Sequence, residues 1–243
     1  MLPVRPRVLM GLLFSPRGGS AQVARYLGRF LPGAGWDVTL VAGSLGAPGD
    51  HGHASTFFDG LDVRAVDYTA SREAPEPLLH VPPYHPSYED RPGAPDPVFA
   101  RVNDVEYERL VHYWATRLHR AGAARADVLH LHHLTPLNEA ARRVAADVPV
   151  VGHLHGTELL MLREIDRGPP AEWRFAARWA ERLRAWAQGC DRLLVLSPDA
   201  VTRVPTLLGV DPERVAWSPN GFDPEGFDRR TVRGTARVDF WRR

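Results

Sequence analysis

A glycine-bearing turn near the N-terminus has the composition of an anion-binding site. The segment Ser15–Ala21 includes Gly18, Gly19 and Ser20, and it follows the apolar run Val8–Phe14. Free N–H groups at a helix start favour anions such as phosphate, and glycine lets a ligand approach the backbone. The segment is neither G-x-G-x-x-G, as expected of a nicotinamide site, nor a P-loop. A tight strand-to-helix turn without a ligand is an equally open interpretation.

Five histidines end two neighbouring apolar runs. His130, His132 and His133 close the first run, and His153 and His155 close the second. Strand side chains repeat every two residues, so His130 shares a face with His132, and His153 with His155. Imidazole is a common metal ligand, but carboxylates nearby are few and H-E-x-x-H is absent, so we expect no bound metal. Hydrogen-bonded strand-end histidines and a substrate-facing role for His155 both stay open.

A second glycine turn follows the second histidine pair. The sequence His155-Gly156-Thr157-Glu158 ends an apolar run and starts a possible helix, repeating the chemistry of the first turn. Glu158 with Glu164 and Asp166 could form an acid–base pair. Carboxylates early in a helix also stabilise its dipole, and we favour this structural role for Glu164 and Asp166.

Strand-like apolar runs alternate with helical periodicity along the chain. The pattern predicts strands at 8–14, 36–42, 61–68, 127–132, 149–154, 192–196 and 215–218, and helices at 21–31, 98–122, 137–146, 171–188 and 199–208. Such alternation implies an α/β, Rossmann-like parallel sheet with helices on both faces.

Residues 71–97 interrupt this alternation. Eight prolines fall within the segment, together with Tyr84, His85 and Tyr88. Long irregular segments in compact domains are usually functional or disordered. We therefore predict a Pro-rich insertion here.

The predicted helix at 171–188 has tryptophans on one face and arginines on another. Such a basic amphipathic helix could contact an anionic membrane surface, although a packed surface helix with a solvated charged face is the simpler interpretation.

Composition indicates an ordinary globular protein. The net charge of +1 gives no basic excess for nucleic acid, and the single Cys190 fits a reducing compartment. No apolar run reaches the length of a membrane span. The run after Arg7 faintly resembles a signal peptide but lacks a cleavage site. We therefore expect a cytoplasmic protein, with peripheral contact at the inner membrane face through 171–188 as an option.

Six segments, in order, resemble family 4 glycosyltransferases. They are Gly18–Ala21, Gly35–Ala42, Asp127–His133, Val150–Glu158, Asp191–Ser197 and Ser218–Asp223. The resemblance implies the N-terminal, acceptor-side half of a GT-B fold at 1–223. It also implies sugar transfer from a nucleotide-sugar co-substrate, with retention of configuration and without a metal or other cofactor.

The resemblance also implies roles for individual residues. It places His155 beside the transferred sugar as the catalytic residue. The donor phosphate and cleft set is Gly18, Gly19, Ser20, Gly156, Thr157, Glu158, Asn220 and Gly221. The acceptor-side set is His132, His133, Tyr84 and His85, and the acceptor would be a small molecule, a glycan or a lipid-linked sugar.

The family pattern continues beyond the Asn220-Gly221 segment into a second, donor-binding domain. Here 224–243 is an Arg-rich tail or the start of an interdomain linker. We expect little or no activity from this chain alone, and a separate chain could supply the second domain. A non-catalytic acceptor-binding module is the main alternative, and a two-domain sugar-nucleotide epimerase is a weaker one.

Overall fold

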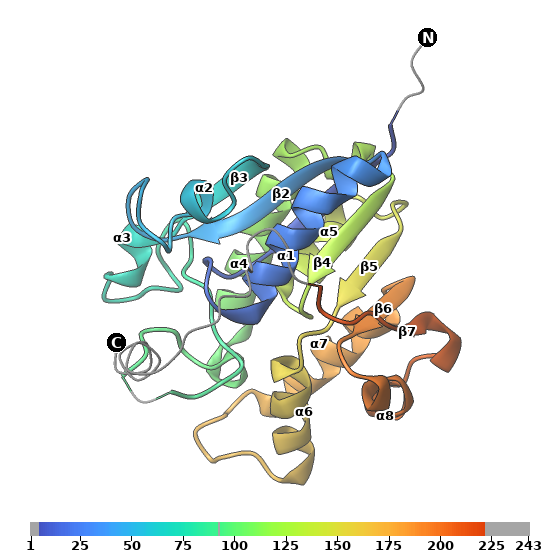
Figure 1. The fold of residues 1–243 in the computed structure, drawn as a ribbon. Coiled ribbons are helices and arrows are strands. Elements are labelled where there is room, and N and C mark those ends of the chain that lie inside the picture. Colours follow the sequence, from blue (N-terminus) through green and yellow to red (C-terminus); the bar gives the residue numbers. More distant parts are fainter. Residues whose placement is uncertain (1–4, 92, 222–243) are drawn as a thin grey trace, which may run out of the picture.

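A single parallel sheet organises the part of the chain that the structure describes. The structure is a computed structural model that describes residues 5–91 and 93–221. The seven strands are β1 (Arg7–Leu12), β2 (Asp37–Ser44), β3 (Asp62–Asp67), β4 (Val128–His132), β5 (Val150–His153), β6 (Arg192–Val195) and β7 (Val215–Trp217). Their order is β3-β2-β1-β4-β5-β6-β7, and every neighbouring pair is parallel (Figure 1). The predicted fold class is confirmed.

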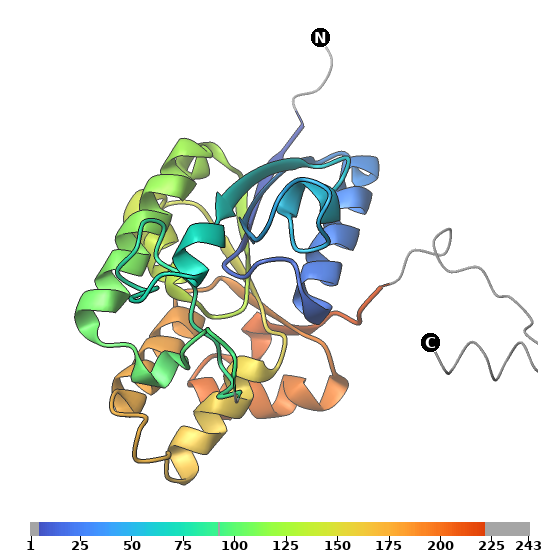
Figure 2. The same ribbon diagram turned by 90° about the vertical axis from the view of Figure 1, so that its left-hand side faces the viewer.

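The sheet lies between helices on both faces, as the alternation predicts. The helices are α1 (Gly18–Phe30), α2 (Ala54–Phe57), α3 (Thr69–Arg72), α4 (Asp104–Arg120), α5 (Pro136–Val144), α6 (Thr157–Arg167), α7 (Ala176–Gln188) and α8 (Pro198–Leu208). Figure 2 shows α1 and α4 on opposite sides of the sheet. The central strand β1 is buried on both faces from Val8 onward, which explains its unbroken apolar sequence.

The helices predicted at 98–122 and 171–188 both begin later in the structure. The second one is α7, which begins at Ala176. The helix predicted at 98–122 is a short turn at Phe99–Arg101 followed by α4. Asn103 starts α4 with a capping box, in which its side chain accepts from Val105 and Glu106 N–H groups. Because the cap satisfies these free N–H groups, it fixes the helix start at Asp104.

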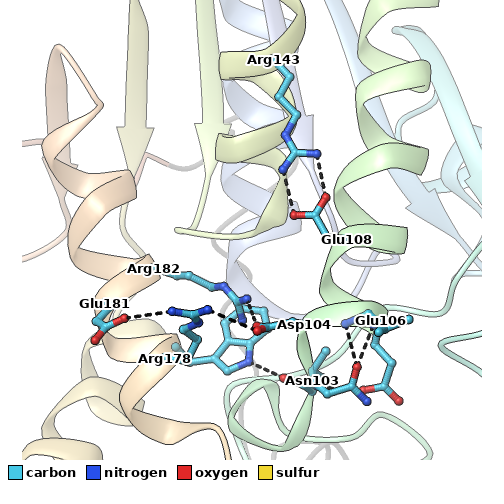
Figure 3. Close-up of polar contacts among 11 residues, drawn as sticks. Asn103, Asp104, Glu106, Glu108, Arg143, Arg178, Glu181 and Arg182 are labelled. Carbon is cyan, nitrogen blue, oxygen red and sulfur yellow. Dashed lines mark hydrogen bonds and ion pairs between the residues drawn. The ribbon is translucent and has the colours of Figure 1, made fainter.

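The arginine face of α7 is tied to α4 rather than left free. Arg178 and Arg182 both pair with Asp104, as Figure 3 shows. The Arg182 guanidinium also lies 3.7 Å from the centre of the Tyr107 ring, a cation–π contact. α7 therefore lies against α4 through polar and stacking contacts.

The tryptophan face of the same segment is in the core, which favours the packed-helix interpretation of 171–188 over the optional membrane contact. Trp173, Trp179 and Trp186 are all buried, and Trp179 Nε1 donates to the Val102 carbonyl. Trp179 and Trp186 pack against Tyr107 of α4, and side chains buried in this way cannot enter a lipid surface. Among the described residues, no helix combines the length and apolar character that a bilayer crossing requires.

The described parts of the Pro-rich segment, 71–91 and 93–97, are packed against the sheet. Tyr84 and His85 are fully buried, and Tyr84 N–H donates to Pro77 O. The rings of Tyr84 and His85 contact the Tyr68 ring. A bridge between Ser87 and Val98 then returns the chain toward α4. The segment thus covers the carboxyl end of the sheet near β1.

Candidate functional site

A pocket of about 400 Å³ lies where the carboxyl ends of the parallel strands meet. Its lining residues come from four strand-end loops, the Pro-rich segment and the chain beyond β7: Phe14, Arg17, Gly18, Gly19, Ser20, Ser87, Tyr88, Glu89, Arg91, His133, His155, Thr157, Leu196 and Asn220. The strand order reverses between β1 and β4 at this edge. Ligands of open α/β sheets bind at such switch points.

The start of α1 forms one wall of the pocket with exposed backbone. Gly18 has a φ of 69°, and no side chain in the described parts of the chain caps the helix at Arg17. A Cβ added at Gly18 or Gly19 would meet no described heavy atom within 4 Å. Since no described side chain covers Gly18 or Gly19, an anion can approach the N–H groups of the first turn.

Two arginines at the pocket converge on one buried carboxylate. Arg17 and Arg91 each place a guanidinium nitrogen 2.7 Å from Asp96 Oδ2. Burial alone would raise the pKa of Asp96, but the hydrogen bond and charge of Arg17 lower it below its usual value. The carboxylate therefore stays ionised and offsets one of the two positive charges. The surplus positive charge lies beside the start of α1.

His133 and His155 form the opposite wall and are held by Glu158. His133 has a φ of 64°, unusual for a residue with a side chain, and its N–H donates to His153 O at 2.8 Å. Glu158 Oε2 lies 3.3 Å from His133 Nδ1, and Oε1 accepts from His155 N–H at 3.0 Å. Burial would raise the pKa of Glu158, but His133 lowers it. Glu158 thus acts as an ionised support for both histidines.

His155 faces the pocket as a neutral ring. Burial and the neighbouring histidines lower the pKa of His155. Its Nε2 lies 3.0 Å from His132 Nδ1, which orients the ring. A neutral, oriented imidazole can donate or accept a hydrogen bond with a polar substrate.

The structure brings seven of the predicted site residues together and leaves the others outside the pocket. Gly18, Gly19, Ser20, His133, His155, Thr157 and Asn220 line it. Gly156 lines an adjoining pocket of about 680 Å³ between α6 and α8, and Gly221 lines one of about 130 Å³ beside α1. Glu158 and His132 are buried behind the wall, and Tyr84 and His85 are buried beneath the Pro-rich segment. The tail predicted at 224–243 lies outside the described residues.

Sequence reasoning missed the two arginines. Arg17 carries a signal, because it directly precedes the glycine pair and so adds positive charge to the turn. Arg91 carries none, because only the folded Pro-rich segment brings it and Asp96 to Arg17. Tyr88, noted in the sequence among the prolines, does reach the pocket, and its hydroxyl donates to the Leu134 carbonyl.

The fold and the position of this pocket define one half of a GT-B glycosyltransferase. The chain belongs to Glycosyltransferase Family 4, whose model matches residues 17–225. A search of curated protein sequences found no match.

Solved structures support the fold at low sequence identity. A sucrose-phosphate synthase from Thermosynechococcus elongatus is 12% identical, with a TM-score of 0.55 over 92% of this chain and 50% of its own. UGT71G1 from Medicago truncatula is 11% identical, with a TM-score of 0.53 over 98% and 56%. The calicheamicin glycosyltransferase CalG4 is 15% identical, with a TM-score of 0.51 over 92% and 55%. The chain therefore spans about half the length of the structures it matches.

Proposed function

We propose that this domain takes part in hexosyl transfer from a nucleotide-sugar donor to an acceptor bound on its own side of the cleft. One observation carries the proposal: the open glycine start of α1, with Arg17 beside it, faces His133 and His155 across a single pocket. The Medicago truncatula structure holds UDP-glucose, and we extend that class of donor to this chain.

The proposed roles follow from the charge that develops during transfer. As the bond between sugar and diphosphate breaks, negative charge grows on the leaving phosphate. Donors that are already oriented toward that charge stabilise the transition state without reorganising. Gly18, Gly19 and Ser20 at the start of α1, together with Arg17, supply such donors. Neutral His155 would hydrogen bond to the sugar, and the residues themselves supply this chemistry without a catalytic metal.

Binding of UDP by the wild-type chain and an Arg17→Ala variant tests the phosphate assignment. A hydrogen bond to a charged group contributes about 1.5–3 kcal/mol, so we expect UDP affinity to fall about 10- to 100-fold. Asp96 keeps Arg91 as its partner, so the fold should survive the change.

Arg174→Ala is the matched control, because Arg174 is exposed and does not line the pocket. It should leave UDP affinity unchanged in isothermal titration calorimetry. Equal affinities for wild type and Arg17→Ala would overturn the phosphate assignment. UDP-sugar binding without transfer, even with a donor-binding domain present, would favour the non-catalytic binding module.

A further inference from the structure

Three histidines behind the pocket wall lie side by side on one face of the sheet. His130 and His132 are two residues apart on β4, and His132 is the register partner of His153 on β5. The three rings are nearly parallel, with centres 4.9–5.3 Å apart. The fold has therefore gathered three imidazoles from two adjacent strands.

The ring nitrogens of this group converge. His130 Nε2 lies 3.2 Å from His153 Nδ1. One nitrogen from each of the three rings lies within 4.8 Å of the other two. Zinc binds imidazole nitrogens at about 2.0–2.1 Å in tetrahedral sites, which places two ligand nitrogens about 3.4 Å apart. The His130–His153 spacing is close to this separation, and a bound ion would replace the hydrogen bond between these two nitrogens. The ring of His132 has to move closer for all three nitrogens to reach one ion.

Polar atoms in the group also lack hydrogen-bond partners. His132 Nε2 and His153 Nε2 are buried and have no partner among the described residues. Buried polar atoms are nearly always paired, so two orphaned nitrogens in one cluster call for an explanation. A metal ion accepts lone pairs from neutral imidazoles and would supply the missing interaction at His132 Nε2.

We propose that His130, His132 and His153 bind a divalent transition-metal ion of the zinc type. An all-imidazole set suits Zn²⁺, Co²⁺, Ni²⁺ or Cu²⁺, whereas Mg²⁺ and Ca²⁺ require oxygen ligands. The sequence alone argued against a metal because few carboxylates lie nearby, and three imidazoles satisfy such an ion without any.

The surroundings of the site suit a bound cation. The fully buried carboxylate of Glu158 holds His133 and His155 next to the three rings and places a negative charge near the site. His153 also lines the pocket of about 130 Å³ next to α1, which gives an ion a route to the ligands. The three ligands lie behind His133 and His155, so the ion would join β4 to β5 beneath the proposed sugar site rather than act on the sugar.

Titration with Co²⁺ tests the proposal on the untagged chain after treatment with a chelator. Imidazole-bound, tetrahedral Co²⁺ absorbs visible light strongly, so binding is read directly. We expect one Co²⁺ per chain, displaced by Zn²⁺. Loss of a hydrogen-bond partner of a metal ligand already costs about 10- to 100-fold in metal affinity, so loss of the ligand itself in His130→Gln or His153→Gln should weaken binding by more than about tenfold.

His112→Gln is the control, because His112 is exposed on α4 and lies outside the cluster. It should bind Co²⁺ like the wild type. No stoichiometric binding by the wild type, or binding unchanged in both ligand variants, would overturn the site. If a ligand variant fails to fold, X-ray absorption of the Zn²⁺-loaded wild type still decides: imidazole scattering supports the site, and an oxygen-only shell contradicts it.

Discussion

His133 lines the pocket and has an unusual backbone conformation. Its positive φ costs of order 1–3 kcal/mol, and the surrounding contacts must offset that cost. The ring packs edge-on against Phe14 and contacts Tyr88 and His155. The backbone turn at the end of β4 thus directs an imidazole into the pocket instead of along the sheet.

Glu158 should stabilise the fold through its ionised form. Replacing it with Gln removes the charge and keeps the shape. A hydrogen bond to a charged group contributes about 1.5–3 kcal/mol, so we expect Glu158→Gln to lower the free energy of unfolding by about that amount at pH 7. Urea denaturation monitored by circular dichroism measures the difference.

The effect of Glu158 should disappear in acid. Its pKa is lowered in the folded protein from the ordinary value of 4.5. A lowered pKa means that the unfolded chain binds the proton more readily, so the stabilisation is complete above about pH 4.5 and is lost as the pH falls through the native pKa. Glu164→Gln, exposed on the same helix, should change stability little at any pH. A Glu158→Gln difference that persists unchanged at low pH would contradict this role.

At the scale of elements, β2 passes very close to the chain that leaves β1. A Cβ at Gly43 would lie 2.5 Å from the Tyr68 ring, 2.8 Å from Leu13 O and 2.8 Å from Phe14 C. Leu13 O also accepts a hydrogen bond from the Tyr68 hydroxyl. Glycine at this position therefore lets the two segments approach closely, and that approach sets where Phe14 enters the pocket.

Gly43→Ala should consequently destabilise the domain. Overpacking of a filled interior costs about 1–3 kcal/mol, and the backbone of Leu13 and Phe14 cannot rotate away as a side chain could. Gly33→Ala is the matched control, because an added Cβ there meets no described atom within 4 Å, and its change should stay within about 0.5 kcal/mol. Thermal and urea unfolding of both variants measure the difference. Equal stabilities of Gly43→Ala and Gly33→Ala would show that β2 can move away from Leu13 and Phe14 at little cost.

At the scale of the whole molecule, the proposed function requires a second domain facing the pocket. The matched solved structures are about twice as long as this chain. Transfer needs the donor and acceptor held together in reactive geometry. We therefore expect the 243-residue chain by itself to show little or no transfer or hydrolysis across a panel of sugar nucleotides.

Adding a donor-binding domain, as a continuation of the chain or as a separate polypeptide, is the complementary experiment. We expect turnover to appear only when both domains are present. Robust turnover by the 243 residues alone would show that this domain holds the donor without help.

The seven strands and the longer helices followed from local sequence, whereas the short helices α2 and α3 were not predicted. Alternating apolar runs and helical periods predicted all seven strands, and the signal was strongest in β1 and β2, because burial between helices favours an unbroken apolar run there. The glycine turns at Gly18, Gly19 and Gly156 could also be predicted, because an apolar run followed by glycine and a helical pattern marks a strand that leads into a helix. The start of α4 was predicted at 98, before Asn103, which caps the helix through its own side chain. The tryptophans of α7 do not show in the sequence which element they pack against.

Tertiary structure alone decided which residues meet. The sequence placed Tyr84 and His85 with the acceptor, yet both are buried, and Arg91 reaches the pocket because the Pro-rich segment folds back through Asp96. Five histidines end two apolar runs in the sequence, but only the register of β4 with β5 brings His130, His132 and His153 against one another. A strand's own sequence fixes its face and its period, whereas its neighbour and register depend on packing across the whole sheet.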